Sequence, residues 1–239
     1  MVKSPGRLTE NCAGRQGFSR AEKTYLAAAI ALAIFALLPA LITPVVLSAA
    51  ASELRISDTT LSKVMASTAA FSTLAGISFG IFVTRVNRVH FAVGGTVLLC
   101  AANLAMALFP SFPVLVTVLH VGAIGGCIVG GIAWGYLGHF KDPKRAFGLF
   151  TICAVLAQAA GTAAVPLLHK GLGFSAVFLF PITLLPVALF ALRFLPARPG
   201  DSAAPRQPVA EAKSSAAQGG LGYAATSASV AAWVLWKVY

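Results

Sequence analysis

The stretch that decides the fold reads AAAIALAIFALLPALITPVVLSAAA and occupies residues 27–51. It contains no charged residue, and a helix needs roughly 20 apolar residues to cross the ~30 Å hydrocarbon core of a bilayer. Basic residues precede the run, as they do in a signal peptide, but a cleavable apolar core spans only ~7–15 residues. The sequence therefore predicts an uncleaved first transmembrane helix.

The composition of the whole chain agrees with this prediction. The 239 residues are 58% hydrophobic and 10% charged, with a mean hydropathy of +0.83, whereas soluble domains carry about 25% charged residues. The net charge of +11 raises the question of nucleic-acid binding. The basic residues lie in short segments between apolar runs, which is typical of membrane orientation, so we expect no nucleic-acid partner.

Seven apolar stretches are long enough to span a bilayer, and none has Asp or Glu in its interior. They do not alternate in polarity as membrane β-strands do. The sequence thus predicts an all-α membrane protein, a polytopic transmembrane helix bundle with the lipid bilayer as its partner. The predicted spans are 24–51, 61–84, 91–109, 112–137, 146–168, 173–195 and 221–239.

Four regions follow from these spans. A basic N-terminal tail covers 1–23, and a six-helix transmembrane bundle covers 24–197. Residues 198–220 are rich in Ala, Pro, Ser and Gln and predict a flexible linker, which leads into a partial or complete seventh transmembrane helix at 221–239.

The Lys and Arg residues predict the orientation of the chain. Fourteen of the 18 fall on the side of the N-terminus and of the 198–220 linker, and segments rich in Lys and Arg stay in the cytoplasm. We therefore expect a multi-pass protein of the cell (plasma or inner) membrane, with its N-terminus and its linker in the cytoplasm.

Three short motifs lie at corresponding places between the spans. The segment GIFVTRVNR at 80–88 resembles the signature loop between the second and third helices of the major facilitator superfamily, which reads Gly, three residues, Asp, Arg, any residue, Gly, Arg. Gly80, Arg85 and Arg88 match, while Thr84 and Asn87 replace the acidic residue and the second glycine. The segments LRISD at 54–58 and KDPKRAFG at 141–148 also resemble segments of that family.

The resemblance covers residues 24–239 and implies the N-terminal half of a major facilitator superfamily transporter, with part of the seventh helix. It implies secondary active transport of a small organic solute or drug-like compound, of an efflux type, by an incomplete or half-length carrier that a second chain would complete. The alternative is a non-transporting membrane protein, such as a truncated carrier product or a helix-bundle partner subunit. The late Pro166 and the absence of an arginine early in the fourth span depart from the family and disfavour proton-coupled antiport.

Two sets of residues have an expected role in closing and packing the bundle. Gly80, Arg85 and Arg88 form a candidate cytoplasmic gating loop, in which the arginines act as a charge latch or simply anchor the cytoplasmic side. Small residues at a spacing of four predict close helix packing or a sliding surface. These are Ser72, Gly76 and Gly80 in the second span, and Gly122, Gly126 and Gly130 in the fourth.

The candidate substrate pathway consists of His120, Gln158 and Thr43. His120 shares one helical face with Cys127, Gly131 and Trp134, and an ionisable group inside a span is usually functional, although an interfacial histidine is the alternative. The Gln158 amide either binds substrate or joins two helices. Thr43 lies between Pro39 and Pro44, which free backbone carbonyls. By the resemblance, Asn103 in the third span would be peripheral.

The sequence does not indicate an enzyme. No catalytic dyad is visible, and the four cysteines, Cys12, Cys100, Cys127 and Cys153, form neither a CxxC pair nor a set with His or Asp at metal-ligand spacing. We expect no catalytic residue, metal or cofactor.

Overall fold

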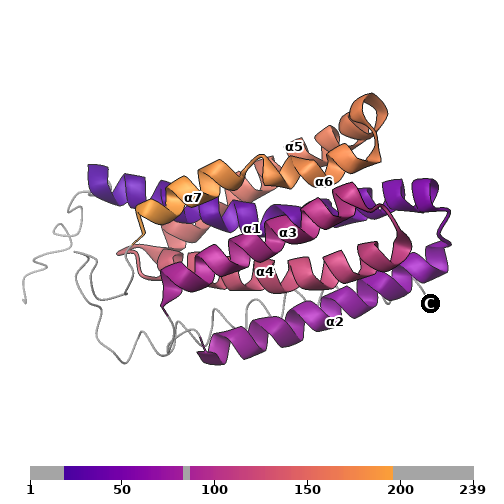
Figure 1. The fold of residues 1–239 in the computed structure, drawn as a ribbon. Helices are drawn as coiled ribbons and strands as arrows, with labels where there is room; N and C mark the ends of the chain where they lie inside the picture. Colours follow the sequence, from indigo (N-terminus) through magenta and orange to yellow (C-terminus); the bar gives the residue numbers. More distant parts are fainter. Residues whose placement is uncertain (1–18, 83–86, 196–239) are drawn as a thin grey trace, which may run out of the picture.

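The computed structural model describes residues 19–82 and 87–195 as one bundle of helices lying roughly along a common axis (Figure 1). Every secondary-structure element in these residues is an α-helix, so the predicted fold class is confirmed. The helices are α1 (Arg20–Leu54), α2 (Asp58–Phe82), α3 (Arg88–Leu108), α4 (Phe112–Gly138), α5 (Pro143–Leu172), α6 (Phe174–Ile182) and α7 (Leu185–Arg193).

Six helical stretches in the described residues are long and apolar enough to cross a membrane. They are α1 to α5 and the segment Phe174–Arg193, which joins α6 and α7. The chain is therefore a multi-pass membrane protein. The predicted tail up to residue 18, the 198–220 linker and the 221–239 span lie outside the described residues.

The first helix begins four residues before the predicted span because its start is capped. Ser19 Oγ accepts a hydrogen bond from the Glu22 N–H at 3.2 Å, and Glu22 Oε2 accepts one from the Ser19 N–H at 2.8 Å. This reciprocal capping box satisfies two backbone donors that have no partner within the helix. Lys141 Nζ also lies 3.7 Å from Glu22 Oε1 and joins the α4–α5 connection to the start of α1.

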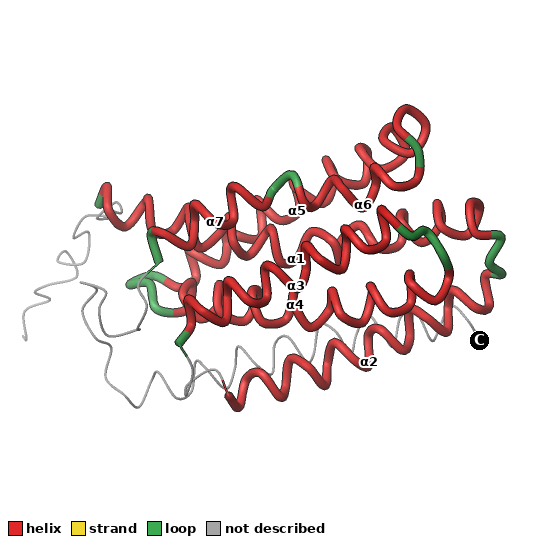
Figure 2. The backbone as a smooth tube through the Cα atoms, in the orientation of Figure 1, coloured by secondary structure: helices red, strands yellow, loops and turns green. Residues whose placement is uncertain are grey.

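The sixth span is broken, whereas the sequence predicted one continuous helix over 173–195. The α6 and α7 helices are separated at Thr183 and Leu184 (Figure 2). Pro181 and Pro186 flank the break, and neither can donate a backbone hydrogen bond to the carbonyl four residues earlier. Two helical hydrogen bonds are therefore missing around Thr183 and Leu184, which explains why the helix is interrupted there.

The helices α1 and α4 lie at the centre of the bundle, and the packing around them repeats. The α1 helix packs against α5, and α4 packs in the same way against α2; α3 lies on α4, and the α6–α7 pair lies on α1. Exchanging the first three spans with the last three reproduces most of these contacts. Because each triplet has an odd number of spans, the two triplets have opposite directions in the membrane, as in an inverted repeat.

Two apolar clusters fill the bundle, one toward each end. Tyr136, at 2% exposure, belongs to the cluster at the end where α1 begins, and Ile42, at 1%, belongs to the cluster at the other end. The tightest crossing between helices joins α3 and α4. A Cβ built on Gly125 would lie only 2.7 Å from the Gly95 carbonyl oxygen, so two backbones touch directly at this point.

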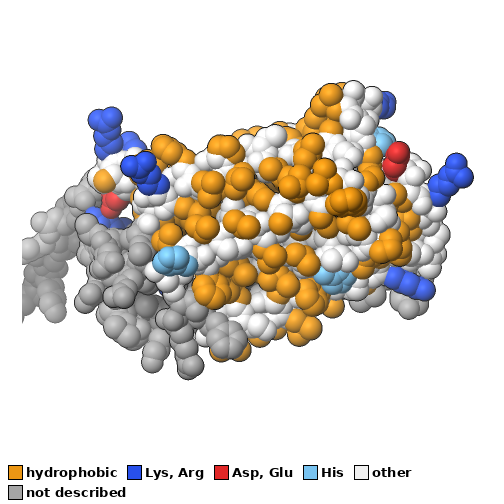
Figure 3. All heavy atoms as spheres, in the orientation of Figure 1, with side chains coloured by type: hydrophobic (Ala, Val, Ile, Leu, Met, Phe, Trp, Pro, Cys, Tyr) orange, Lys and Arg blue, Asp and Glu red, His pale blue; other side chains and the backbone are white. Residues whose placement is uncertain are grey.

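The charged side chains of the described residues lie near the ends of the helices, and hydrophobic side chains are spread over the face between them that Figure 3 shows. Each end has two carboxylates. We call the end where α1 begins the basic end, because it holds Arg20, Lys23, Arg88, Lys141, Lys144, Arg145 and Arg193, against Arg55, Lys63 and Lys170 at the opposite end. This distribution matches a bundle that crosses a bilayer with its ends in water.

Candidate functional site

A partly open cavity of about 120 Å³ is lined by residues of α1, α2, α3, α4 and α6. Along α4 the lining residues run from Val118 to Trp134. At 1.5 Å of rise per residue this distance is ~24 Å, and the hydrocarbon core of a bilayer is ~30 Å thick. The α4 residues that line this cavity, which we call the α4 cavity, therefore span most of the depth of the membrane.

The lining of the α4 cavity is mostly apolar and contains no charged side chain. Its polar side chains come from four helices. They are Thr43 of α1, Thr68 and Ser72 of α2, Asn103 of α3, and Cys127 and Trp134 of α4. Small polar groups on an apolar surface are typical of sites that bind organic molecules and orient them by a few hydrogen bonds.

Three of these polar side chains donate to the backbone of their own helix. Thr43 Oγ1 donates to the Pro39 carbonyl at 2.7 Å, Ser72 Oγ to the Thr68 carbonyl at 2.7 Å, and Asn103 Nδ2 to the Leu99 carbonyl at 2.8 Å. A hydroxyl has one donor and two acceptor positions, and an amide oxygen only accepts. These bonds therefore use the hydroxyl donors and leave oxygen acceptors on the lining.

Thr68 differs from its neighbours because its buried hydroxyl has no hydrogen-bond partner. A threonine in a helix often donates to the carbonyl four residues earlier, which here belongs to Val64. Ser67 Oγ already donates to that carbonyl at 2.9 Å. A buried polar group without a partner costs ~1–3 kcal/mol, so this hydroxyl calls for an explanation.

Prolines leave two further carbonyls of lining residues without their usual helical donors. Pro44 has no N–H for the carbonyl of Ala40, and Pro181 has none for the carbonyl of Val177. Both Ala40 and Val177 line the α4 cavity. Each carbonyl lacks its usual helical donor, as is common where transmembrane helices line polar cavities.

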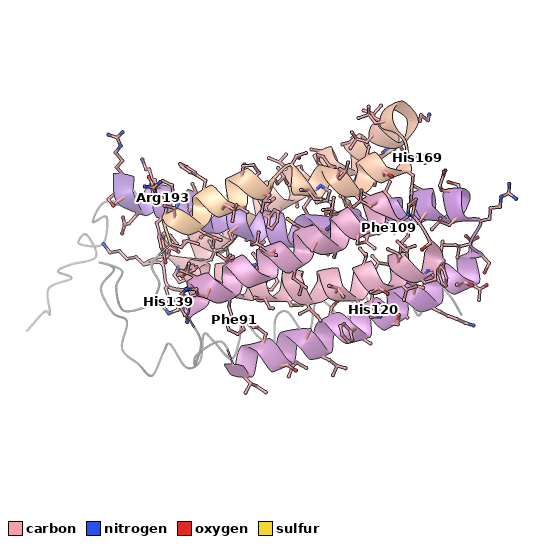
Figure 4. The ribbon with its side chains drawn as sticks, in the orientation of Figure 1. Phe91, Phe109, His120, His139, His169 and Arg193 are labelled. Carbon is pink, nitrogen blue, oxygen red and sulfur yellow. The ribbon has the colours of Figure 1, made fainter. Side chains whose placement is uncertain are left out.

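The structure places the three predicted pathway residues in different surroundings. Thr43 lines the α4 cavity, and His120 and Gln158 do not. His120 lies between α4 and α2 (Figure 4), where its ring is 5.2 Å from that of Phe71. Its Nδ1–H donates to the Val116 carbonyl at 2.7 Å. Gln158 is exposed on the surface of α5, close to the middle of that helix.

The predicted polar face of α4 packs against α2. The Cys127 thiol donates to the Ser72 carbonyl at 3.4 Å, and a Cβ on Gly131 would meet the ring of Phe79 at 3.0 Å. Cys127 and Trp134, which share this face, also line the α4 cavity. This face of α4 therefore contacts α2 and also forms part of the cavity lining.

The predicted stripe of small residues divides among several neighbours. Gly126 and Gly130 lie against Ala36 of α1, at 3.1 and 3.6 Å from a built Cβ, and Gly122 faces Leu99 of α3 at 3.7 Å. In α2, Ser72 contacts α4 as described, and Gly76 is half-buried. A Cβ on Gly80 would meet no atom within 4 Å.

The candidate gating residues lie at the basic end. Arg88 is the first residue of α3, and its guanidinium carbon lies 5.9 Å from the centre of the Tyr136 ring, within range of a cation–π interaction. Its Nη1 is buried and has no hydrogen-bond partner. The Tyr25 ring packs edge-on against that of Tyr136 at 5.8 Å. Arg85 lies outside the described residues.

Sequence reasoning missed the two most informative polar residues of the cavity. Asn103 was expected to be peripheral, yet it is 7% exposed and lines the α4 cavity. Thr68 gave no signal of its own among the many Ser and Thr residues of α2. The described residues contain no group of three His, Cys, Asp or Glu side chains that could hold a metal ion.

Comparison with known proteins assigns no family to this chain. It matches no protein-family model and no curated protein sequence.

Proposed function

We propose that this chain is the substrate-binding half of a secondary active transporter, similar to half of a major facilitator superfamily carrier, for a small organic solute or drug-like compound. The observation that carries the proposal is the α4 cavity, which has polar residues from four helices and whose lining residues cover ~24 Å of α4. A structural helix bundle has no need of a cavity that polar side chains from four helices line, because buried polar groups are costly in a membrane.

The repeated packing supports the same proposal. Transporters of this type are built from inverted three-helix repeats within each six-helix half, and the substrate site lies at the interface between repeats. Here the two central helices of the repeat, α1 and α4, both line the α4 cavity. The cavity therefore occupies the place that such a repeat gives to a substrate site.

The exposed side of α5 indicates that a second protein surface covers part of the bundle. Gln158 lies near the middle of this membrane-spanning helix and is exposed, next to the small residues Ala159 and Ala160. An amide facing hydrocarbon without a partner costs ~1–3 kcal/mol by protein mutational estimates. We propose that a second bundle covers this side of α5, so that transport consists of one bundle rocking against the other.

Arg88 fits a role in closing the cytoplasmic side, which we propose to be the basic end. Its guanidinium lies over Tyr136, and its Nη1 lacks a hydrogen-bond partner. A buried donor of this kind favours an acceptor from another surface when the bundle changes state. The distribution of charge also supports an orientation with this end in the cytoplasm, in the plasma or inner membrane.

The test is solute flux from liposomes at two densities of the purified chain. At the lower density most occupied vesicles contain one chain, and at the higher density most contain several. The proposal predicts no saturable flux from single chains and saturable flux of at least one organic solute where a second copy, or an added partner protein, completes the carrier. Saturable flux from single chains would contradict the half-carrier proposal.

Folded chains that carry no solute under either condition would favour the second candidate, a non-transporting partner subunit. The observation that favours this candidate is the same exposed amide of Gln158, because it fits a static contact with another helix as well as a moving one. Circular dichroism and a monodisperse elution profile would establish that the reconstituted chains are folded.

A further inference from the structure

We propose that the α4 cavity binds an uncharged, slender, amphipathic molecule that has an O–H or N–H donor, and that Thr68 contacts the polar group of this molecule. The inference deepens the proposed function and rests on it, since it assigns a class of substrate to the same cavity. It depends on three properties of the lining, namely its charge, its balance of donors and acceptors, and its shape.

The charge of the lining favours a neutral molecule over an ion. None of the lining residues is Lys, Arg, Asp, Glu or His. An anion would find no cationic side chain, and an ammonium group would find no carboxylate. Burying an ion without a partner costs far more than burying a neutral polar group, so a neutral molecule is favoured over both.

The lining offers more acceptors than donors, although the Thr68 O–H and the second Asn103 N–H also have no partner among the described residues. The Thr43 and Ser72 hydroxyls and one Asn103 N–H already donate to backbone carbonyls. The carbonyls of Ala40 and Val177 face proline nitrogens in place of helical donors. A ligand that brings its own O–H or N–H therefore finds partners that a ligand with acceptors alone does not.

The shape of the cavity favours a slender molecule with an apolar body. Its volume of about 120 Å³ is somewhat less than the ~150 Å³ of an engineered cavity that binds benzene, and its lining residues cover ~24 Å of α4. Most of the lining is apolar, so an alkyl chain suits it better than a polyol.

Two threonines with buried hydroxyls make Thr68 testable. Thr68 and Thr96 both have a buried hydroxyl without a hydrogen-bond partner, but only the Thr68 side chain lines the α4 cavity, where a change of its χ1 rotamer would bring the hydroxyl to the ligand. Replacing either with valine removes an unsatisfied hydroxyl while it nearly preserves the shape of the side chain. Both substitutions should therefore raise the thermal stability of the chain, and only Thr68→Val should weaken ligand binding.

The binding experiment uses four probes that share a short alkyl body. They are pentan-1-ol, its isomer butyl methyl ether, pentylammonium and pentanoate. The full chain is reconstituted in lipid nanodiscs with Trp233→Phe and Trp236→Phe, which leaves Trp134 of the cavity as its one tryptophan. Fluorescence of Trp134 reports binding, and these probes do not absorb where indole is excited.

We expect pentan-1-ol to bind most tightly, butyl methyl ether more weakly, and the two ions not to bind at concentrations that saturate the alcohol. Thr68→Val should weaken pentan-1-ol binding roughly two- to ten-fold, the value of one ordinary hydrogen bond. Thr68→Ser should restore it, and Thr96→Val should leave it unchanged. The Thr96→Val variant also corrects for effects of the probes on the bilayer.

Tight binding of pentanoate or pentylammonium, equal binding of the alcohol and the ether, or unchanged binding in Thr68→Val would each overturn the inference. These measurements are made at equilibrium, without a solute gradient. The expected order of probes in a chain that shows no flux would leave the inference standing and remove the carrier proposal. Flux of an organic anion through the cavity would remove the inference and leave the carrier proposal standing.

Discussion

Replacing Gly125 with alanine would place a methyl group at the closest helix crossing of the bundle. The new Cβ would lie 2.7 Å from the Gly95 carbonyl oxygen, 3.0 Å from the Leu99 nitrogen and 3.2 Å from the Leu99 Cβ. Carbon atoms pack best at about 3.5–4.0 Å. None of these three atoms lies at the far end of a flexible side chain, so none can rotate away and α3 must move as a whole.

The expected cost follows from two opposing terms. Overpacking of a well-packed interior costs about 1–3 kcal/mol, and alanine recovers about 0.5–1 kcal/mol relative to glycine in a helix. We therefore expect Gly125→Ala to lower the free energy of unfolding by up to about 2.5 kcal/mol. The matched control is Gly94→Ala on α3, where a new Cβ meets nothing within 4 Å and should be neutral or stabilising by up to about 1 kcal/mol.

Equilibrium unfolding of the purified variants in mixed micelles, followed by circular dichroism, measures both values on one scale. The two substitutions add the same methyl group, so differences in helix propensity cancel between them. If Gly125→Ala proves as stable as Gly94→Ala, then α3 and α4 do not meet as closely as described, and the packing account of the bundle is wrong.

Three further predictions concern orientation, the basic end and the α5 surface. A cysteine at Ser214, outside the described residues, should react with an impermeant thiol reagent only after cells are permeabilised; reaction in intact cells would reverse the orientation. Arg88→Ala should lower the free energy of unfolding by about 0.5–2 kcal/mol through loss of the interaction with Tyr136. The control is Lys23→Ala, at an exposed residue of the same end, which should change the free energy of unfolding by less than about 0.5 kcal/mol. Equal effects of the two substitutions would contradict a special role of Arg88. Gln158→Leu should leave the isolated chain as stable as the parent or more so and abolish flux in the completed carrier, and undiminished flux would show that the amide faces lipid.

The six spans of the described residues could be predicted from the sequence because apolar length alone determines whether a helix crosses a bilayer. The boundaries were less predictable, since they depend on local hydrogen bonds. The first helix starts at a capping box in which Ser19 and Glu22 are three residues apart. Counting apolar residues does not detect this polar pattern. The break in the sixth span depends on Pro181 and Pro186 together, and neither proline alone interrupts an apolar run.

The candidate site could be predicted only in part. Thr43 stood out because prolines flank it, and the structure places it on the cavity lining. A spacing of four identified Gly126 and Gly130, which pack against α1. The closer contact is between Gly125 of α4 and Gly95 of α3. It could not be predicted from α4 alone, because it depends on which residue of α3 lies opposite. Thr68 could not be identified from sequence, because the sequence does not show which of the α2 hydroxyls lacks a hydrogen-bond partner.

The most direct test of the central claim, that the α4 cavity is a solute pathway, is the two-sided reactivity of a cysteine at Thr43. The variant is made without the four native cysteines, in right-side-out and inside-out membrane vesicles, with Leu74→Cys as a control because Leu74 is exposed on the apolar surface of α2. The account predicts that an impermeant thiol reagent reaches Thr43→Cys from both sides of the membrane, that bound solute slows both reactions, and that Leu74→Cys stays inert. Reaction from one side only, or from neither side, would contradict it.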